Sequence, residues 1–340
     1  MTSIGSVAFG GCSKLSEISI PSSIKSIGND AFSGCGGLTG VYITDFTSWC
    51  EIKFPTSQYP ESNPLYYAHH LYLNEELVTH VKIPVSVGTI GMTFNGASDI
   101  VSVQIPETCT RITNLAFEGC MLEAVLTKNV NTSINNGGFS QRSMRHAMLY
   151  IPEGTWSNAV YESDWYIFDN IREVAMDKNN LSAGKAYCLM DSESFGYMVY
   201  DDASRTTKSV TAFYSIDESD PVNSWQIVEN EGKIYLYNIG AKKYATFIHD
   251  GTVVLNDSPR AIDFSDGQNG IKIGNKEWYF VLNKNVSVDK DLTNVNTIST
   301  FITHPHSTYY SLNGCKIENP QKGLNIIRMS NGKTQKVVVK

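Results

Sequence analysis

Apolar positions in the first half of the chain repeat every 22 or 23 residues. The segment Ile4–Cys12 returns as Ile27–Cys35, with Ile-Gly, Ala-Phe and Gly-Cys pairs at the same positions. The Ile-to-Phe core of this segment recurs three more times, beginning at Ile90, Ile112 and Ile134. Copies in one register indicate a repeat architecture, in which no unit can bury its apolar side chains alone and each stacks on its neighbours.

Each repeat also carries a short alternating stretch that predicts one β-strand. The segments 18–20 and 103–105 read Ile-Ser-Ile and Val-Gln-Ile. Such alternation is expected when one row of side chains faces a core and the next row faces out. Several of these stretches end in Ile-Pro, and Pro stops strand pairing because it lacks a backbone N–H. The period therefore predicts a solenoid of stacked coils with ladders of like residues inside it.

The repeat is interrupted between residues 44 and 82. Within this insert, Thr44 or Asp45 is placed to cap a short helix that runs to Ile52. Further on, Leu-Tyr-Leu at 71–73 and Leu-Val at 77–78 predict a hairpin that turns at Asn74-Glu75. After the last repeat, we expect an aromatic helical segment to cover the final coil with four side chains: Tyr161, Trp165, Phe168 and Ile171.

The pattern IGxxAFxGCxxLxxIxIP resembles the BspA-like leucine-rich repeats of bacterial surface proteins, which are frequent in Bacteroides and its relatives. The resemblance extends over residues 1–175. It includes the insert at 44–82, with its Asn-Pro-Leu-Tyr-Tyr-Ala-His-His segment, and a closing cap at 152–175. It implies a leucine-rich-repeat solenoid, a cell-surface location, and a role in adhesion or protein binding.

Residues 176–298 lack this repeat and are rich in aromatic residues, with frequent turn residues, which predicts an all-β domain. A weak threefold self-similarity begins at Tyr187, Tyr235 and Trp278. Three units with the length set by these starting points fit a β-trefoil. The segments 223–227 and 237–244 resemble ricin-type trefoil modules of Bacteroides proteins. A β-sandwich predicts similar strand spacing and stays open as the alternative.

The last segment, residues 299–340, predicts a small C-terminal β-module whose strands are joined by Asn-Gly and Lys-Gly turns. It resembles the short C-terminal β-modules of secreted Bacteroidetes proteins, which implies export. Because a unit of this size has a marginal core, we expect it to pack on the preceding domain. The predicted fold class is mainly β: a leucine-rich-repeat solenoid, a trefoil-like all-β domain and this module.

Composition narrows the function classes. The 340 residues are 41% hydrophobic and 18% charged with a net charge of −7, so neither disorder nor binding to nucleic acid is expected. No apolar run approaches the roughly 18 residues that a transmembrane helix needs. The N-terminus has no signal-peptide pattern and begins inside a repeat, so we expect a truncated piece of a longer exported protein. A second copy could stack on such an open first coil, and the oligomeric state stays open.

The seven cysteines indicate neither disulfides nor a metal site. Cys12, Cys35 and Cys120 occupy one repeat position, which Ala97 fills in a shorter copy. Because Ala cannot ligate a metal or form a disulfide, this position predicts a ladder of small buried side chains. The other four show no CxxC spacing: Cys50, Cys109, Cys188 and Cys315.

Catalytic motifs are missing from the sequence, and we predict no enzymatic activity, no cofactor and no metal site. Two groups of histidines are the strongest metal candidates, one of His69, His70 and His80 and the other of His304 and His306. Metal binding would need further carboxylate or thiol ligands within reach of either group. His69-His70 lies in the insert that resembles the family's own, so packing explains its presence, and His304 and His306 lie in a polar stretch around Pro305. A two-carboxylate site has no fixed sequence spacing, and nothing in the sequence favours one.

Aromatic side chains of the trefoil-like domain are the best candidates for ligand contact, because Tyr and Trp offer a large contact area at low entropic cost. Four of them are predicted to stack on sugars: Trp225, Tyr235, Tyr237 and Tyr244. The alternative is that these rings form the core layers of the domain itself.

The sequence as a whole predicts a non-enzymatic, extracellular or cell-surface protein for binding or adhesion. It would recognise a host or bacterial surface protein through the repeat solenoid. Two alternatives stay open. In the first, the trefoil-like domain is a carbohydrate-binding module with a glycan as its partner. In the second, the chain is an accessory region of a larger exported enzyme whose catalytic domain precedes Met1.

Overall fold

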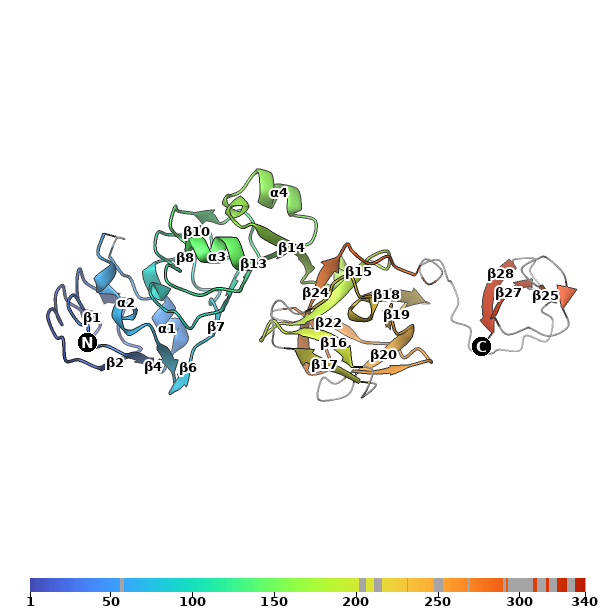
Figure 1. Ribbon diagram of the computed structural model, residues 1–340, viewed down its shortest axis with the longest axis horizontal. Coiled ribbons are helices and arrows are strands. Elements are labelled where there is room, and N and C mark those ends of the chain that lie inside the picture. The colour runs from blue at the N-terminus through green and yellow to red at the C-terminus, as the bar shows by residue number, and fades with distance from the viewer. Residues whose placement is uncertain are drawn as a thin grey trace.

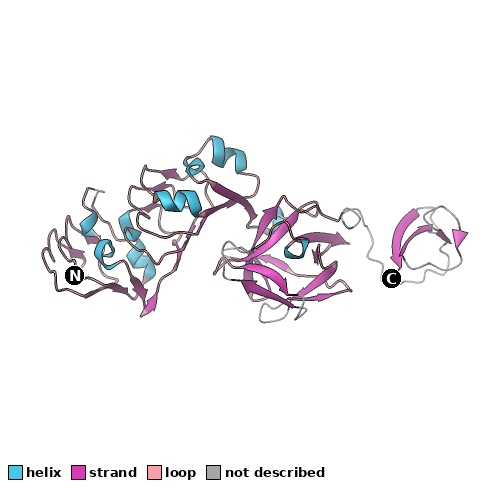
Figure 2. Cartoon of the chain, in the orientation of Figure 1, coloured by secondary structure: helices cyan, strands magenta, loops and turns pink. Residues whose placement is uncertain are grey.

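The computed structural model describes residues 1–55, 58–201, 206–210, 216–230, 232–247, 253–267, 270–289 and 292, together with strands at 308–310, 316–317, 323–328 and 334–339. The protein is mainly β, as the sequence predicts, and its helices are short (Figure 1 and Figure 2). Strands β1–β14 form an N-terminal part that we call the repeat domain. Strands β15–β24 form a second part, which we call the β domain.

Longer parallel strands of the repeat domain carry one set of ladders. They are β2 (Glu17–Ile20), β4 (Gly40–Ile43), β5 (Leu71–Leu73), β7 (His80–Lys82), β9 (Ser102–Ile105), β11 (Ala124–Thr127), β13 (Met148–Pro152) and β14 (Asn170–Ala175). They form two sheets, in the orders β2-β4-β5 and β7-β9-β11-β13-β14. The register sets Val125 between Val103 and Leu149. Apolar side chains thus lie on apolar side chains from coil to coil.

A second set of two-residue strands lies elsewhere in each repeat. β1 (Ser3–Ile4) pairs with β3 (Ser26–Ile27), and β10 (Arg111–Ile112) pairs with β8 (Thr89–Ile90) and β12 (Ser133–Ile134). The repeat phenylalanines stack as well. The ring of Phe117 lies 5.6 Å from that of Phe94 and 5.1 Å from that of Phe139, with both pairs nearly parallel. The predicted stacking of like residue on like residue is confirmed at these positions.

The insert forms local structure and then rejoins the ladders. The side chain of Asp45, rather than that of Thr44, caps helix α1 (Phe46–Cys50) by accepting the Ser48 N–H at 2.6 Å. The segments η1 (Pro60–Ser62) and α2 (Leu65–Ala68) follow. Strand β5 then pairs with β4 and, as predicted, turns at Asn74-Glu75 into β6 (Glu76–Leu77), while β7 pairs with β9.

The repeat that begins at Ile90 contains the short helical turn η2 (Met92–Phe94), and helix α3 (Gln141–His146) follows β12, the last strand of the two-residue set. An aromatic cap comes after the last repeat. The cap consists of α4 (Trp156–Tyr161) and η3 (Asp164–Ile167). The rings of Trp165 and Phe168 lie 6.1 Å and 5.1 Å from that of Phe139, so they continue the phenylalanine stack. Tyr161, in contrast to the prediction, is 80% exposed, whereas Ile171 is buried.

The β domain is antiparallel. Its elements are η4 (Lys178–Asn180), β15 (Ala186–Asp191), β16 (Tyr197–Asp201), β17 (Thr206–Val210), η5 (Pro221–Asn223), β18 (Trp225–Asn230), β19 (Lys233–Asn238), β20 (Lys243–Phe247), β21 (Val253–Asn256), β22 (Phe264–Asp266), β23 (Ile271–Ile273) and β24 (Lys276–Asn283). Strand pairing closes a ring in the order β15-β18-β19-β20-β21-β17-β16 and back to β15. Its core contains Tyr187, Trp225, Leu236 and Phe280. The trefoil interpretation and the boundaries at 176–298 stay predictions.

The C-terminal strands form one antiparallel sheet of their own. They are β25 (Thr308–Tyr310), β26 (Lys316–Ile317), β27 (Gly323–Arg328) and β28 (Thr334–Val339), in the order β26-β25-β27-β28. Most of the connecting residues, including His304, His306 and Cys315, lie outside the described residues. The boundaries of the C-terminal module at 299–340 and its packing on the β domain stay predictions.

Candidate functional site

Alternate side chains of the long parallel strands point away from the core of the coils. On β11, Val125 is buried in the repeat core, whereas Ala124 and Leu126 belong to a different apolar cluster on the opposite side of the sheet. We call this outward surface the strand face. Its members are Glu17, Ser19, Tyr42, Tyr72, His80, Lys82, Ser102, Gln104, Ala124, Leu126, Tyr150, Arg172 and Val174.

The C-terminal half of the strand face is covered by the β domain. The contact is an apolar cluster, which we call the junction cluster. It contains Ala124, Leu126, Tyr150 and Val174 from the repeat domain and Cys188, Met190, Phe195, Tyr197, Tyr279 and Val281 from the β domain. All of these side chains are buried, so this half of the face is not accessible to a partner.

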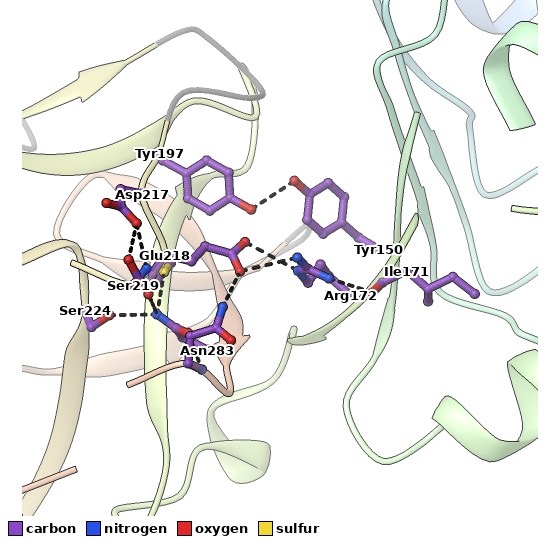
Figure 3. Close-up of polar contacts among 11 residues, drawn as sticks. Tyr150, Ile171, Arg172, Tyr197, Asp217, Glu218, Ser219, Ser224 and Asn283 are labelled. Atoms are coloured by element: carbon purple, nitrogen blue, oxygen red, sulfur yellow. Dashed lines mark hydrogen bonds and ion pairs between the residues drawn. The ribbon is translucent and has the colours of Figure 1, made fainter. Parts of the chain in front are cut away.

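Polar contacts fix the same junction (Figure 3). The hydroxyl groups of Tyr150 and Tyr197 lie 3.0 Å apart, and burial raises the pKa of both. Arg172 donates from Nε and Nη2 to the two carboxylate oxygens of Glu218, at 3.3 Å each. Asn283 donates to the backbone carbonyl of Glu218 at 2.8 Å and thereby holds the segment that carries this carboxylate.

Backbone pairing continues across the junction. Strand β14 of the repeat domain pairs antiparallel with β24, with Val174 opposite Val281. Beside it, Tyr279 donates its hydroxyl to Oε1 of Gln104 at 3.0 Å, and Lys284 lies 3.1 Å from a carboxylate oxygen of Glu173. One sheet therefore runs from the repeat domain into the β domain, and the two are joined by backbone, apolar and charged contacts together.

The N-terminal half of the strand face is open, at the end of the repeat domain far from the β domain in Figure 1. Here Tyr42 of β4 and Tyr72 of β5 are directly opposite in register. Their rings stack with centroids 4.7 Å apart and planes at 10°, and both are only half-buried. We call them the tyrosine pair. Leu77 of β6, opposite Tyr72, is 43% exposed and extends this apolar surface.

A shallow hollow adjoins the tyrosine pair. Its lining includes Glu17, Ser19, Pro21, Tyr42, Thr44, Asn74 and Glu75. The Tyr42 hydroxyl donates to Oε1 of Glu17 at 3.4 Å. Desolvation, reinforced by the carboxylates of Glu17 and Glu75 and by Tyr72, raises the pKa of Tyr42. Tyr42 therefore stays a neutral hydrogen-bond donor at physiological pH.

Gly40 explains why the Tyr42 ring lies flat against its strand. A Cβ added to Gly40 would stand 3.0 Å from Cε2 of Tyr42, which is tighter than nearly all such contacts. Any larger residue at this position has to displace the ring. The sequence therefore positions Tyr42 by leaving out a side chain two residues before it.

A larger groove lies on the other side of the repeat domain, between the insert and the later coils. Its lining includes Lys25, Lys53, Phe54, Thr89, Met92 and Asn114. One hydrogen bond crosses it, from the Ser86 hydroxyl to Oε1 of Glu51 at 2.9 Å. The groove mixes both charges and presents no aromatic stack, so it offers less specific chemistry than the tyrosine pair.

The four residues predicted to stack on sugars lie in the β domain. Trp225 is fully buried in its core, and Tyr237 and Tyr244 are buried with ring centroids 5.1 Å apart. Stacking on a sugar needs an exposed ring face, so these placements favour the alternative that the rings form the core. Tyr235 is half-buried, 6.4 Å from Tyr244, and the prediction of a glycan site now depends on it.

The repeat cysteines sit in the predicted ladder. Cys35 and Cys120 are buried and donate to the backbone carbonyls of Phe9 and Phe94, at 3.1 Å and 3.3 Å, while Ala97 is buried at the equivalent position. Burial raises the pKa of both thiols, which makes them unreactive. Cys12 in the first coil is exposed.

Within the residues that the structure describes, no group of three His, Cys, Asp or Glu side chains could hold a metal ion. His70 Nδ1 instead contacts the Asp99 carboxylate, and His80 Nδ1 lies 2.7 Å from the Ser102 hydroxyl. His304 and His306 lie outside the described residues. None of the helices in the described part of the chain has the length and apolarity to cross a membrane.

The tyrosine pair is the element that sequence reasoning missed. The signal was present, because Val-Tyr-Ile at 41–43 and Leu-Tyr-Leu at 71–73 both place a tyrosine at the outward position of a strand. Their pairing could not be seen, since the two tyrosines are 30 positions apart in the sequence and only the parallel register of β4 and β5 brings the rings together.

A comparison with known protein families agrees with the repeat architecture. A family model described as a BspA type leucine-rich repeat region matches six copies over residues 1–58 and 68–196, more than half of the chain. No curated protein matches. A solved leucine-rich cell surface protein from Faecalibacterium prausnitzii A2-165 is similar, with 16% identity and a TM-score of 0.26. The match covers 60% of this chain and 48% of the neighbour's chain. This chain therefore spans about half the length of that neighbour. On the family match, this chain belongs to the BspA-type leucine-rich repeat proteins.

Proposed function

We propose that this protein is a non-enzymatic, secreted or cell-surface binding protein whose leucine-rich-repeat solenoid recognises another protein. The observation that carries the proposal is the division of the strand face. Its C-terminal half is occupied by the β domain, while its N-terminal half presents the stacked tyrosine pair to solvent. The partner would be a surface protein of the host or of another bacterium.

The chemistry of the open half supports a protein partner. Tyrosine is enriched at protein interfaces because its ring offers large contact area and its hydroxyl offers a hydrogen bond at the cost of only two torsions. The stacking of Tyr42 on Tyr72 already restricts both rings, so little side-chain entropy remains to be lost on binding. Exposed Leu77 adds an apolar contact beside them.

The β domain supports this function indirectly. It buries the outward residues of β11, β13 and β14 and adds a strand to their sheet. A repeat stack held in this way cannot bend at its C-terminal end without breaking the junction. We infer that the β domain holds the repeat domain in one shape, so that the open half of the face stays preorganised for a partner.

Replacement of both rings tests the proposal. We expect the variant Tyr42→Ala/Tyr72→Ala to lose binding to protease-sensitive receptors on target cells, measured with the purified full chain by flow cytometry. A control with Tyr161→Ala/Tyr166→Ala removes two tyrosines that are 80% and 65% exposed on the cap, away from the strand face. Equal binding by both double variants, with both folded, would exclude the strand face as the recognition surface.

A glycan is the second candidate ligand, in the trefoil-like interpretation of the β domain. The half-buried ring of Tyr235, beside Tyr244, is the feature that favours it. A glycan array probed with the full chain and with Tyr235→Ala tests this candidate. Glycan signals that persist in the variant would place a sugar site elsewhere. A role as accessory region of a larger exported enzyme stays a prediction.

A further inference from the structure

The hollow beside the tyrosine pair is lined by charged side chains of one sign. The hollow beside the pair is lined by two carboxylates, those of Glu17 and Glu75, and its described lining contains no basic side chain. Both glutamates are exposed, and neither has an ion-pair partner in the part of the chain that the structure describes. The two carboxylates are therefore available to a ligand.

The backbone of the turn that carries Glu75 has an unusual conformation. Asn74 and Glu75 have φ values of 50° and 71°, so the β5–β6 turn is of the kind in which both central residues are left-handed. Glycine is favoured at the second of these positions, and a glutamate is strained there. The strained turn places the carboxylate of Glu75 at the rim of the hollow.

We infer that the tyrosine pair and the carboxylates of Glu17 and Glu75 bind an arginine side chain from an exposed basic segment of the partner protein. This inference rests on the proposed function and names the chemistry of its partner. The flat guanidinium stacks on the tyrosine ring, and its N–H groups donate to the carboxylates. Lysine provides the charge without the flat surface and binds more weakly.

The charge of the whole chain is complementary to such a partner. With a net charge of −7, the protein attracts basic segments at long range and repels acidic ones. A glycan does not need this charge, because it stacks on aromatic rings and accepts hydrogen bonds without carrying a positive group. Salt dependence therefore separates an arginine ligand from a sugar at the same tyrosine pair.

A labelled peptide probe tests the inference on the full chain. The probe is a fluorescein-labelled peptide with three arginines separated by glycine and serine, and the comparison peptides carry lysine or uncharged citrulline in their place. We expect the arginine peptide to bind best in a fluorescence anisotropy titration. Citrulline should weaken binding by about tenfold or more, because charge-assisted hydrogen bonds and cation–π contact are lost together.

Matched variants locate the binding. Glu17→Gln/Glu75→Gln removes both charges and keeps the side-chain shape, and we expect about tenfold weaker binding of the arginine peptide. Glu107→Gln/Glu162→Gln removes two exposed charges elsewhere and should bind as the wild type does. Equal affinity for the citrulline peptide, or full affinity in Glu17→Gln/Glu75→Gln, would overturn the inference.

The same variants separate this inference from the proposed function. If Tyr42→Ala/Tyr72→Ala loses the cell-surface receptors while Glu17→Gln/Glu75→Gln keeps them, the strand face binds a protein but not through arginine. If neither variant changes receptor binding, both proposals fail. Thermal unfolding of each variant checks that the exposed substitutions leave the fold intact.

Discussion

The hydroxyl groups of Tyr150 and Tyr197 meet at 3.0 Å inside the junction between the repeat domain and the β domain. Tyr150 is an outward residue of a repeat strand, at a position that solvent would reach if the repeat stack stood alone. It is 1% exposed because the β domain covers it. The two domains are therefore joined through the outward side of the later repeat strands, and the open part of the strand face lies on the first coils.

This hydroxyl pair predicts a specific pattern of stabilities. Tyr150→Phe or Tyr197→Phe alone leaves the other hydroxyl buried with one partner fewer, and should lower the free energy of unfolding by about 1–2 kcal/mol. The double variant removes both polar groups and should cost less than the sum of the single changes. Urea denaturation of the full chain measures the free energy of unfolding of the wild type, the two single variants and the double variant. Additive losses would show that the two hydroxyls do not interact.

The phenylalanine stack predicts a larger effect. Phe117 is fully buried between Phe94 and Phe139, so Phe117→Ala leaves a cavity that the neighbouring coils cannot fill. We expect a loss of about 3–5 kcal/mol in the free energy of unfolding, by chemical denaturation. Phe117→Leu keeps most of the volume and should cost clearly less. Similar costs for the two variants would mean that volume is not what the stack requires.

Alkaline pH should destabilise the protein through its buried thiols and phenols. Burial raises the pKa of Cys188 from the usual 9.0 to about 12. The unfolded chain then releases this proton first, so the free energy of unfolding is steady below about pH 8 and falls as the pH rises from 9 towards 12. One such group contributes at most about 1.4 kcal/mol per pH unit.

Cysteine variants check this pH dependence. Cys188→Ala removes the titrating thiol, and the fall in unfolding free energy between pH 9 and pH 11 should be shallower than in the wild type. Cys12→Ala removes an exposed thiol and serves as the control. An unchanged slope in Cys188→Ala would show that this thiol does not contribute.

The repeat domain could be predicted in detail because its information is local and recurs. The Ile, Phe and Cys positions each return at nearly the same spacing, and their ladders follow from stacking alone. The hairpin at Asn74-Glu75 and the cap by Asp45 likewise depend on neighbours in sequence. The exposed position of Tyr161 was missed because helical periodicity does not show which side of the cap faces the last coil.

The junction could not be predicted, because it depends on residues far apart in sequence. Gln104 contacts Tyr279 across the junction, and no spacing rule relates the two. Aromatic content alone also gave no way to tell a core ring from a binding ring. Trp225 and Tyr235 come from similar stretches, yet one is fully buried and the other half-buried. Only the packing of the closed ring of strands decides between them.

Gly40 provides the last test, because it acts on the tyrosine pair without touching its chemistry. A Cβ at this position stands 3.0 Å from the Tyr42 ring, so Gly40→Ala should tilt the ring and weaken its stacking on Tyr72. We expect about three- to tenfold weaker binding of the arginine peptide, since cation–π contact depends on ring placement. The matched control is Gly36→Ala, where an added Cβ meets nothing within 4 Å. If Gly40→Ala binds like Gly36→Ala while a crystal structure shows the ring displaced, the position of Tyr42 is irrelevant to binding.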